Sequence, residues 1–248
     1  MRPAPGRASL VAMTRRRRAR SAPVLVLAAA LVTGAASVLA QDREAGQGDP
    51  DDLAAALALP GDPVRGRRAY EACASCHLPS GAGRPDGTFP QLAGQHRAVL
   101  VKQLVDIRSG RRTNPVMAPY ARALLDAQEI ADVAAYVATL PLPGDQGLGE
   151  GQDLARGGRL YGRDCARCHG ASGEGDTARI VPALRGQHYA YLLRQVRSIS
   201  SGLRGNAHPE MASVVAEYSD AELRAVVDYA ARLGRDGVGP DAAPAPGR

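Results

Sequence analysis

The chain has 248 residues, which is enough for one large domain or two small ones. Its formal net charge is +6, but residues 1–40 contain seven arginines and no acidic residue, so the remainder carries a net charge of −1. The basic excess therefore belongs to the N-terminal segment, and nucleic acid is not a predicted partner. With one Phe and no Trp, a small domain of this chain has little bulk for its core, and a buried non-protein group would supply it.

Residues 1–40 have the composition of a signal peptide for export. The basic residues Arg15–Arg18 and Arg20 precede the apolar run Ala22–Val32, and small residues continue to Ala40. We expect cleavage after Ala40. An uncleaved membrane anchor is the second interpretation, because residues 22–40 are nearly long enough to span a bilayer. Their many alanines make the run only weakly apolar, which favours cleavage.

The rest of the chain contains an internal repeat. Two Cys-x-x-Cys-His motifs stand 92 residues apart, and the segment Pro90–His96 (PQLAGQH) matches Pro182–His188 (PALRGQH) at the same offset. A repeat of this length predicts two domains of one type. We expect these domains over residues 61–143 and 152–234, a linker over 144–151, a polar lead-in over 41–60 and a disordered tail over 235–248.

Each copy is predicted to be helical, without a convincing strand. A first helix is expected at about 64–72, with its counterpart at 155–163. A second helix has apolar residues at helical spacing over 99–107, and its counterpart covers 189–199. The last helices begin at the capping-box sequences Asp126-x-x-Glu129 and Ser219-x-x-Glu222.

The four cysteines all belong to the two C-x-x-C-H motifs. The residues are Cys73, Cys76 and His77 in the first copy, and Cys165, Cys168 and His169 in the second. Thiols three positions apart can form thioethers with the two vinyl groups of one haem, and the adjacent histidine then supplies a proximal nitrogen to the iron. The motifs therefore predict two covalently bound haem c groups.

Three other interpretations of the cysteines are weaker. Structural zinc requires further Cys or His ligands in matching positions of each copy. A thioredoxin-like redox pair requires a βαβ context, which the helical pattern does not provide. Disulfides are common in exported proteins, but they leave the paired histidines unexplained.

The sixth iron ligands are predicted to be Met117 and Met211. Beyond residue 40 they are the only methionines, and they follow the haem histidines by 40 and 42 residues. A proline lies two positions before each, in a segment expected to be an irregular loop before the last helix. Histidine with methionine is the ligand pair that raises the potential of carrier cytochromes. The alternatives are a core-packing role for the methionines and ligation by His96 and His188, for which a structural role at the start of the second helix is preferred.

These residues resemble the class I cytochromes c, and in particular the tandem two-haem members of the cytochrome c4 type. The resemblance covers about residues 62–140 and 151–233. It implies an all-α fold with two tandem domains, each a small helical bundle wrapped around a covalently bound haem. In the family an aromatic residue packs where the first and last helices cross. The matching tyrosines are Tyr70 and Tyr161, three and four residues before their cysteines, with Tyr136 and Tyr229 on the last helices.

The resemblance also implies a function. The expected protein is a periplasmic electron carrier rather than an enzyme, with two haem domains that face each other. Its expected partners are redox proteins such as a respiratory dehydrogenase and a terminal oxidase, and a loose association with the inner membrane is compatible with this role. Two alternatives remain. One is a cytochrome subunit of a periplasmic oxidoreductase complex, for example with a flavoprotein sulfide dehydrogenase. The other is a two-haem peroxidase, which needs one iron with an open coordination position and for which this short chain lacks an inserted catalytic segment.

Overall fold

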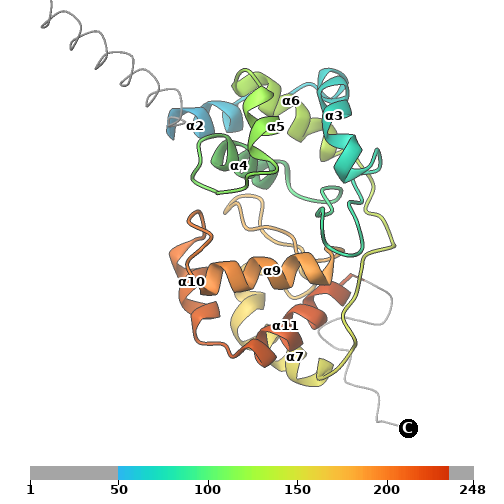
Figure 1. The fold of residues 1–248 in the computed structure, drawn as a ribbon, viewed down its shortest axis with the longest axis vertical. Helices are drawn as coiled ribbons and strands as arrows, with labels where there is room; N and C mark the ends of the chain where they lie inside the picture. Colours follow the sequence, from blue (N-terminus) through green and yellow to red (C-terminus); the bar gives the residue numbers. More distant parts are fainter. Residues whose placement is uncertain (1–49, 235–248) are drawn as a thin grey trace, which may run out of the picture. The chain divides into compact units, whose positions relative to one another are not determined.

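The computed structural model describes residues 50–234, and Figure 1 shows its helices in chain order. The predicted signal peptide over 1–40 and the predicted tail over 235–248 lie outside the described residues. Within the described part every regular element is a helix, and the one β-pairing is an isolated bridge between Asp176 and Val181. The all-α prediction is confirmed. Across the same residues no helix has both the length and the apolar character needed to cross a membrane.

The N-terminal domain is built from five helices. They are α2 (Pro50–Ala58), α3 (Pro63–His77), α4 (Arg97–Arg108), α5 (Ala118–Ala123) and α6 (Ala127–Val137). The first long helix, α3, packs along α6, and α4 covers another side of α6. Ile130 of α6 and Val101 of α4 are fully buried in the shared core. The last helix therefore holds the domain together.

Helix α2 lies within the segment that was expected to be a polar lead-in. It packs against α4 and α6, and its Ala56 is fully buried. The side chain of Arg97 donates a hydrogen bond of 3.2 Å to the Ala56 carbonyl, at the last turn of α2. An arginine there satisfies carbonyl groups that a helix end leaves free. Part of the lead-in thus belongs to the packed domain.

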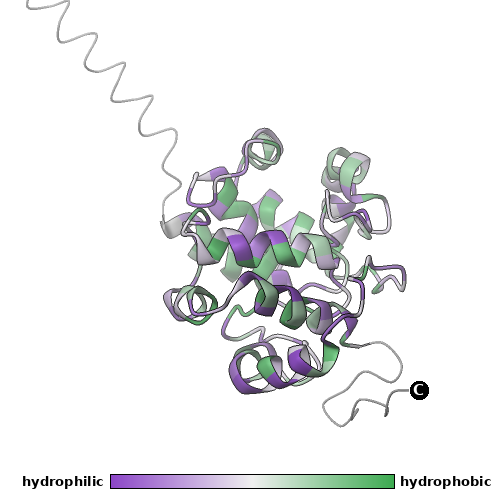
Figure 2. Ribbon diagram, turned by 60° about the horizontal axis from the view of Figure 1, so that its bottom comes forward, coloured by the Kyte–Doolittle hydropathy of each residue, from purple (hydrophilic) through white to green (hydrophobic). Residues whose placement is uncertain are grey.

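The C-terminal domain repeats this arrangement. Its helices are α7 (Leu154–Leu160), a π-helical turn (Tyr161–Cys165), α8 (Ala166–His169), α9 (Tyr189–Ser200), α10 (Pro209–Ala216) and α11 (Asp220–Arg232). Helix α11 packs against both α7 and α9. In Figure 2 the helices carry hydrophobic and hydrophilic residues on different sides, as helices that bury one face do.

The first and last helices of each domain cross at a glycine. A Cβ on Gly66 would lie 1.9 Å from the carbonyl oxygen of Asp132, and one on Gly157 would lie 2.1 Å from that of Ala225. These distances are far below van der Waals contact, so only glycine lets the two backbones approach this closely. The same crossing geometry in both domains orients the helical segment that carries each C-x-x-C-H motif.

A π-helical turn explains why the tyrosines have different offsets from their cysteines. Tyr70 and Tyr136 have ring centroids 5.4 Å apart, and Tyr161 and Tyr229 have theirs 5.6 Å apart. Both pairs therefore form, although Tyr161 has one more residue between it and its cysteine. The wider turn of a π-helix accommodates one additional residue without changing the direction of the chain. The turn thus keeps the helix crossing and the haem motif in the same relation as in the first domain.

The predicted starts of the last helices are confirmed. The carboxylate of Asp126 accepts a hydrogen bond of 2.9 Å from the Glu129 N–H at the start of α6. At the start of α11, Ser219 and Glu222 form a complete capping box. The chain between α6 and α7 has no regular helix, in agreement with its proline and glycine content.

Candidate haem sites and domain interface

The first candidate haem site lies at the C-terminal end of α3. Cys73 and Cys76 are one helical turn apart, and His77 is the last residue of the helix. The imidazole of His77 is buried, with 3% of the residue exposed. Its Nδ1 atom lies 2.9 Å from the carbonyl oxygen of Pro90. The following residue, Leu78, has a positive φ of 65°, which ends the helix directly after the histidine.

The second candidate site has the same construction. Cys165 ends the π-helical turn, and Cys168 and His169 lie on the short helix α8. His169 is buried, and its Nδ1 atom lies 2.9 Å from the carbonyl oxygen of Pro182. Pro182 stands 92 residues after Pro90, so the two histidines are held by equivalent carbonyls.

The hydrogen bonds determine which ring nitrogen can bind iron. A carbonyl oxygen only accepts, so Nδ1 of each histidine carries the proton and Nε2 keeps its lone pair. Burial lowers the pKa of both His77 and His169, against a smaller opposing effect of the proline carbonyls. The neutral imidazole required of a metal ligand is thereby favoured.

The cysteines are compatible with uncharged thioethers. None of the four forms a disulfide, and all are partly buried. Burial raises the pKa of the Cys73 thiol, and it raises that of Cys165 to about 12. Such sites disfavour a thiolate, the form that zinc and disulfide exchange require. Among the described residues there is no group of three or more His, Cys, Asp or Glu side chains that could hold a metal ion. The donor set thus fits haem attachment better than the other interpretations.

Met211 lies on a short helix rather than on an irregular loop, whereas Met117 lies in the turn that leads into one. Met117 is the N-cap residue of α5, and Met211 lies in the first turn of α10. For Met211 the expectation of a loop was wrong, because the proline before it is the first residue of α10, where its fixed φ favours a helix start. His208, exposed in front of it, accepts a hydrogen bond of 3.3 Å from the Glu210 N–H. Ligation by the methionines stays a prediction.

Comparison with known proteins gives the family. The family model described as "Cytochrome c" matches the chain twice, over residues 63–141 and 154–233. The chain belongs to the cytochrome c family. It is 38% identical to "Cytochrome c4" of Thiocapsa roseopersicina over 72% of this chain and 96% of the relative. It is 36% identical to "Thiosulfate dehydrogenase electron acceptor" of Stutzerimonas stutzeri over 68% of this chain and 82% of the relative.

A solved structure supports the same assignment. The reduced recombinant cytochrome c4 from Pseudomonas stutzeri superposes with a TM-score of 0.63 at 28% identity, over 70% of this chain and 99% of that one. The protein is therefore a cytochrome of the c4 type with two covalently bound haem c groups. It is an electron carrier and not an enzyme. The predicted fold, cofactors and type of activity are confirmed.

The repeated Gly-Gln-His segments of this cytochrome form one contact between its two domains. His96 and His188 are the N-cap residues of α4 and α9, but neither side chain caps its helix. The Nε2 atom of His96 lies 2.7 Å from the carbonyl oxygen of Glu174, and that of His188 lies 2.8 Å from the carbonyl oxygen of Ala82. Glu174 and Ala82 are 92 residues apart, so the two contacts are equivalent and reciprocal.

Glutamines complete this neutral contact. Gln187 accepts from the Gln91 N–H at 3.0 Å and donates to the Gln91 carbonyl at 2.8 Å. Gln95 makes the matching pair with Ala183, with both hydrogen bonds at 3.0 Å. Each cross-domain donor here has a neutral acceptor. At this contact the domains are therefore joined by hydrogen bonds to backbone groups that carry no net charge.

The sequence predicts these segments as a repeat but does not indicate an interface. His96 and His188 were predicted to have a structural role at the start of a helix, and in the structure that role is to connect the domains. The available signal was the recurrence of polar Gln and His residues at one offset in both copies. Polar residues that recur in both domains and do not bind haem need hydrogen-bond partners outside the haem site. In a tandem protein, the other domain can provide those partners.

Proposed function

We propose that this cytochrome is a periplasmic carrier that moves electrons between respiratory redox proteins. In this proposal the four cysteines hold the haems, and the axial ligand pairs are His77 with Met117 and His169 with Met211. The observation that supports it most directly is the duplicated hydrogen bond from histidine Nδ1 to a proline carbonyl. It leaves Nε2 as the iron-binding atom in both domains.

Haem iron supplies a one-electron couple, and the chain's residues set how that couple behaves. The proline carbonyls fix the ring plane and tautomer of each proximal histidine. The buried cores formed by α3, α4 and α6, and by α7, α9 and α11, exclude water around the site. A thioether sulfur from methionine and an apolar surrounding both favour the ferrous state. Ligands supplied by packed helices change little between oxidation states, as a carrier requires.

Export and domain boundaries are part of the same proposal. Residues 1–40 are assigned as the signal peptide, 61–143 and 152–234 as the haem domains, with α2 packed against the first of them, and 144–151 as the linker. Haem attachment to C-x-x-C-H motifs and an N-terminal export signal are consistent with one another in an exported c-type cytochrome. The proposed donor and acceptor are redox proteins, for example a dehydrogenase and a terminal oxidase.

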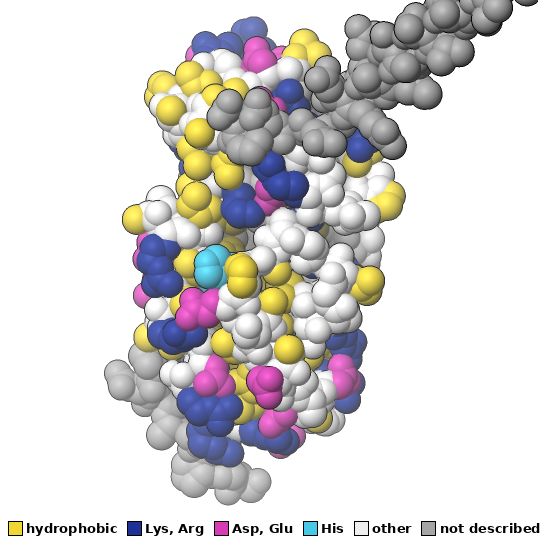
Figure 3. Space-filling view, turned by 90° about the vertical axis from the view of Figure 1, so that its left-hand side faces the viewer, with side chains coloured by type: hydrophobic (Ala, Val, Ile, Leu, Met, Phe, Trp, Pro, Cys, Tyr) yellow, Lys and Arg dark blue, Asp and Glu magenta, His cyan; other side chains and the backbone are white. Residues whose placement is uncertain are grey.

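The surface is compatible with more than one partner. On the face shown in Figure 3, Lys and Arg side chains alternate with Asp and Glu side chains and with hydrophobic residues. A mixed surface of this kind does not generate strong steering toward one sign of charge. Docking on that face would depend more on shape and apolar contact than on long-range attraction.

A second candidate function is the electron acceptor of one particular oxidoreductase. It is supported by the relative named "Thiosulfate dehydrogenase electron acceptor", which is 36% identical to this chain. In that case the chain would receive electrons from a thiosulfate-oxidising enzyme as a bound or transient subunit. Stoichiometric co-purification with such an enzyme, and reduction of both haems by thiosulfate only when it is present, would favour this candidate over a general carrier.

The test of the carrier proposal is the optical spectrum of the reduced holoprotein with and without carbon monoxide. Haem content is measured first by the pyridine haemochrome method, and we expect two haems per chain. Carbon monoxide should not change the spectrum, because methionine occupies the sixth position of both irons. Met117→Leu and Met211→Leu are the positive controls, and each should make about half of the haem absorbance sensitive to the gas.

Two results would contradict the proposal. A change in about half of the wild-type absorbance would show one open iron, which a carrier does not need. An unchanged spectrum in Met117→Leu or in Met211→Leu would show that the altered residue is not a ligand.

A further inference from the structure

The hydrogen bond that orients each proximal histidine continues into the other domain. The carbonyl group of Pro90, which accepts from Nδ1 of His77, belongs to the same peptide group as the N–H of Gln91. That N–H donates to Oε1 of Gln187 in the C-terminal domain at 3.0 Å. A single peptide group therefore lies between the proximal histidine of one domain and a glutamine side chain of the other. We call His77, this peptide group and Gln187 the first relay.

The second haem site has an equivalent arrangement in the opposite direction. Nδ1 of His169 lies 2.9 Å from the carbonyl oxygen of Pro182. The N–H of the same peptide group, which is that of Ala183, donates to Oε1 of Gln95 in the N-terminal domain at 3.0 Å. We call this set the second relay. Because Gln95 and Gln187 are 92 residues apart, the pseudo-symmetry of the tandem domains produces both relays.

Each glutamine side chain is held in this position by further hydrogen bonds. Nε2 of Gln187 donates to the Gln91 carbonyl at 2.8 Å, and its Oε1 also accepts from the His188 N–H of its own domain at 3.0 Å. Gln95 makes the corresponding two bonds in the other direction, both at 3.0 Å. A side-chain amide that is bonded at both its oxygen and its nitrogen has a fixed orientation, so its oxygen stays on the peptide N–H of the relay.

The first relay is more buried than the second. Gln91 is 5% exposed and Gln187 is 7% exposed, whereas Gln95 is only partly buried. Resonance couples the N–H and the carbonyl of a peptide group. Hydrogen bonds in series therefore polarise one another, and they are stronger where water is excluded. The bond at each peptide N–H should thus make the carbonyl a stronger acceptor for the histidine, with the larger effect in the first relay.

We propose that Gln187 and Gln95 are positioning residues for the haem of the opposite domain, and that each sets the potential of that haem through the proximal histidine. This inference rests on the proposed function, in which His77 and His169 bind iron. A stronger acceptor at Nδ1 makes the imidazole more basic, and a more basic ligand favours the ferric state. The docked domains thus hold both potentials below the values that they would have without these bonds.

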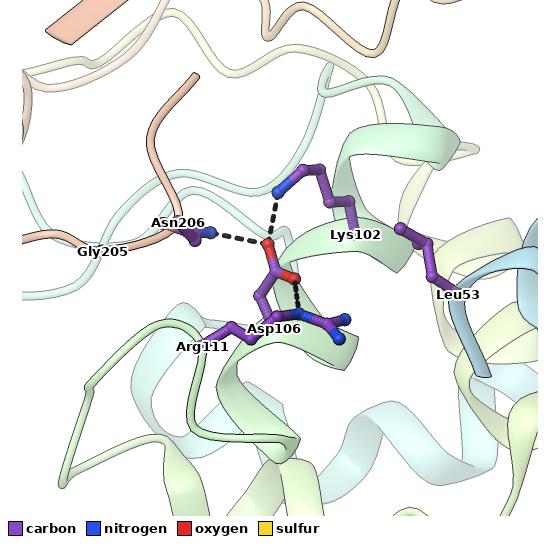
Figure 4. Close-up of a pocket in the computed structure, with 6 residues that line it drawn as sticks. All are labelled: Leu53, Lys102, Asp106, Arg111, Gly205 and Asn206. Carbon is purple, nitrogen blue, oxygen red and sulfur yellow. Dashed lines mark hydrogen bonds and ion pairs between the residues drawn. The ribbon is translucent and has the colours of Figure 1, made fainter. Parts of the chain in front are cut away.

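A second contact between the domains provides a comparison, because it lies outside both relays. Figure 4 shows Asp106 between Lys102, Arg111 and Asn206, at a pocket of about 400 Å³ between the two domains. Asn206, from the C-terminal domain, donates to the Asp106 carboxylate at 2.7 Å. Within the described residues, the side chain of neither Asp106 nor Asn206 forms a hydrogen bond with a residue of the relays. Removing this bond weakens docking without altering the peptide groups.

The test compares Gln187→Leu with wild type in holoprotein that carries two haems per chain. Leucine has no acceptor for the peptide N–H, so the Pro90 carbonyl becomes a weaker acceptor for His77. We expect the oxidation equilibrium of the N-terminal haem to shift toward the ferrous state by about twofold to fivefold, while that of the C-terminal haem stays unchanged. In the NMR spectrum of the reduced protein, the Nδ1–H resonance of His77 should move upfield, because its hydrogen bond is weaker. A redox titration followed by NMR assigns each shift to its haem.

Gln95→Leu is the reciprocal variant. It should shift the C-terminal haem in the same direction by about twofold, because Gln95 is less buried, and it should move the Nδ1–H resonance of His169. It also tests the proposal if Gln187→Leu does not fold, since a partly buried position tolerates the loss of hydrogen bonds better.

Two control variants remove cross-domain hydrogen bonds outside the relays. Asn206→Ala removes the bond to Asp106, and His96→Leu removes the bond from Nε2 to the Glu174 carbonyl. Each should change both oxidation equilibria by less than about 1.5-fold and leave both Nδ1–H resonances in place, because the acceptors of the proximal histidines are unaltered.

The proposal is overturned if the two glutamine variants keep the oxidation equilibria and Nδ1–H resonances of wild type while two haems are present. It is also overturned if only the haem in the altered residue's own domain shifts. If the controls shift the equilibria as much as the glutamine variants do, looser docking explains the change and the proposal is wrong. Carbon monoxide binding to wild type, or haem content below two per chain, would instead contradict the proposed function.

Discussion

The two domains of this cytochrome keep the same helix crossing but fasten it with different polar contacts. In the N-terminal domain the buried Asp132 of α6 accepts from the Asp62 N–H at 2.6 Å and from Arg65 Nε at 2.7 Å, which ties the start of α3 to the last helix. In the C-terminal domain the buried Asp228 of α11 accepts instead from the N–H groups of Gly149 at 3.1 Å and Gly151 at 2.7 Å. There the last helix holds the connection between the domains.

This comparison distinguishes the contacts that both haem domains share from the contacts that differ between them. The glycine crossing and the tyrosine pair occur in both domains, because they orient the helix that carries the C-x-x-C-H motif. The buried aspartates occupy different turns of their helices and hold different segments. A buried carboxylate only requires donors around it, and either segment can supply them.

The largest loss of stability is expected at the glycine where the first and last helices cross, which both domains share. Gly66→Ala and Gly157→Ala each place a Cβ about 2 Å from a backbone carbonyl oxygen of the last helix. The helices must separate to accommodate it, so each substitution should lower the free energy of unfolding of its domain by about 3 kcal/mol or more. Chemical denaturation of the holoprotein measures the loss. Amide hydrogen exchange then shows whether it is confined to the altered domain.

Gly162→Ala is the matched control for the crossing. It also lies in the first helical region of its domain, but a Cβ there has no atom within 4 Å. We expect a change below about 1 kcal/mol, in either direction. If Gly66→Ala and Gly157→Ala were no more destabilising than this control, the close approach of the helices would not hold the domains together.

Much of this comparison could be predicted from the sequence. The C-x-x-C-H motifs, the repeat and the capping boxes are local patterns, and they located both haem sites and all the main helices of the two copies. The π-helical turn could not be predicted, because its signal was a one-residue change in the offset of Tyr161. The cross-domain contacts of His96 and His188 were also missed. These contacts depend on how the two folded domains pack against each other. The sequence pattern within one repeat does not predict that packing.

An intermediate effect is expected from the buried aspartates. Burial by itself raises the pKa of Asp132, but hydrogen bonds from Arg65, Gln128 and the Asp62 N–H outweigh it, and the net shift is downward. A carboxyl group with a lowered pKa in the folded state stabilises the protein above its unfolded value of about 3.9. That stabilisation is lost as the pH falls through the lower folded pKa.

Asp132→Asn should therefore destabilise the N-terminal domain by about 1–3 kcal/mol at pH 7. The difference from wild type should begin to shrink below about pH 4, where the carboxyl of the unfolded chain becomes protonated, and it should continue to shrink as the pH falls through the lower pKa of the folded state. Denaturation curves across this pH range measure it, and Asp145→Asn, at an exposed position without hydrogen bonds, is the control. A difference that stayed constant down to pH 2 would show that the charge of Asp132 has no role.

Asp228→Asn sharpens the comparison from the other domain. Its hydrogen bonds hold Gly149 and Gly151, so the loss should appear as faster amide exchange in the connecting segment. The start of α3 should be unaffected. Faster exchange at the start of α3 would instead mean that the two aspartates do not have separate roles.

The smallest effect is expected at the solvent edge of the haem sites. In the C-terminal domain, Arg167 inside the C-x-x-C-H motif forms an ion pair of 2.6 Å with Glu210, which precedes Met211. The equivalent residues of the N-terminal domain are Ser75 and Val116, and Val116 is 61% exposed. The ion pair thus links the motif to the methionine segment in one domain only.

This ion pair is exposed, with 55% and 46% of the two side chains accessible, so it contributes at most about 1 kcal/mol. Arg167→Ser should ease displacement of Met211 by imidazole by no more than about fivefold, and salt should reduce the difference from wild type. The double substitution Ser75→Arg with Val116→Glu should make Met117 harder to displace by a similar factor. Imidazole titrations followed by optical spectra measure both. If imidazole displaces Met211 at the same concentration in Arg167→Ser as in wild type at low salt, packing alone holds the segment that contains Met211. The difference in sequence between the two methionine segments then has no effect on ligand exchange.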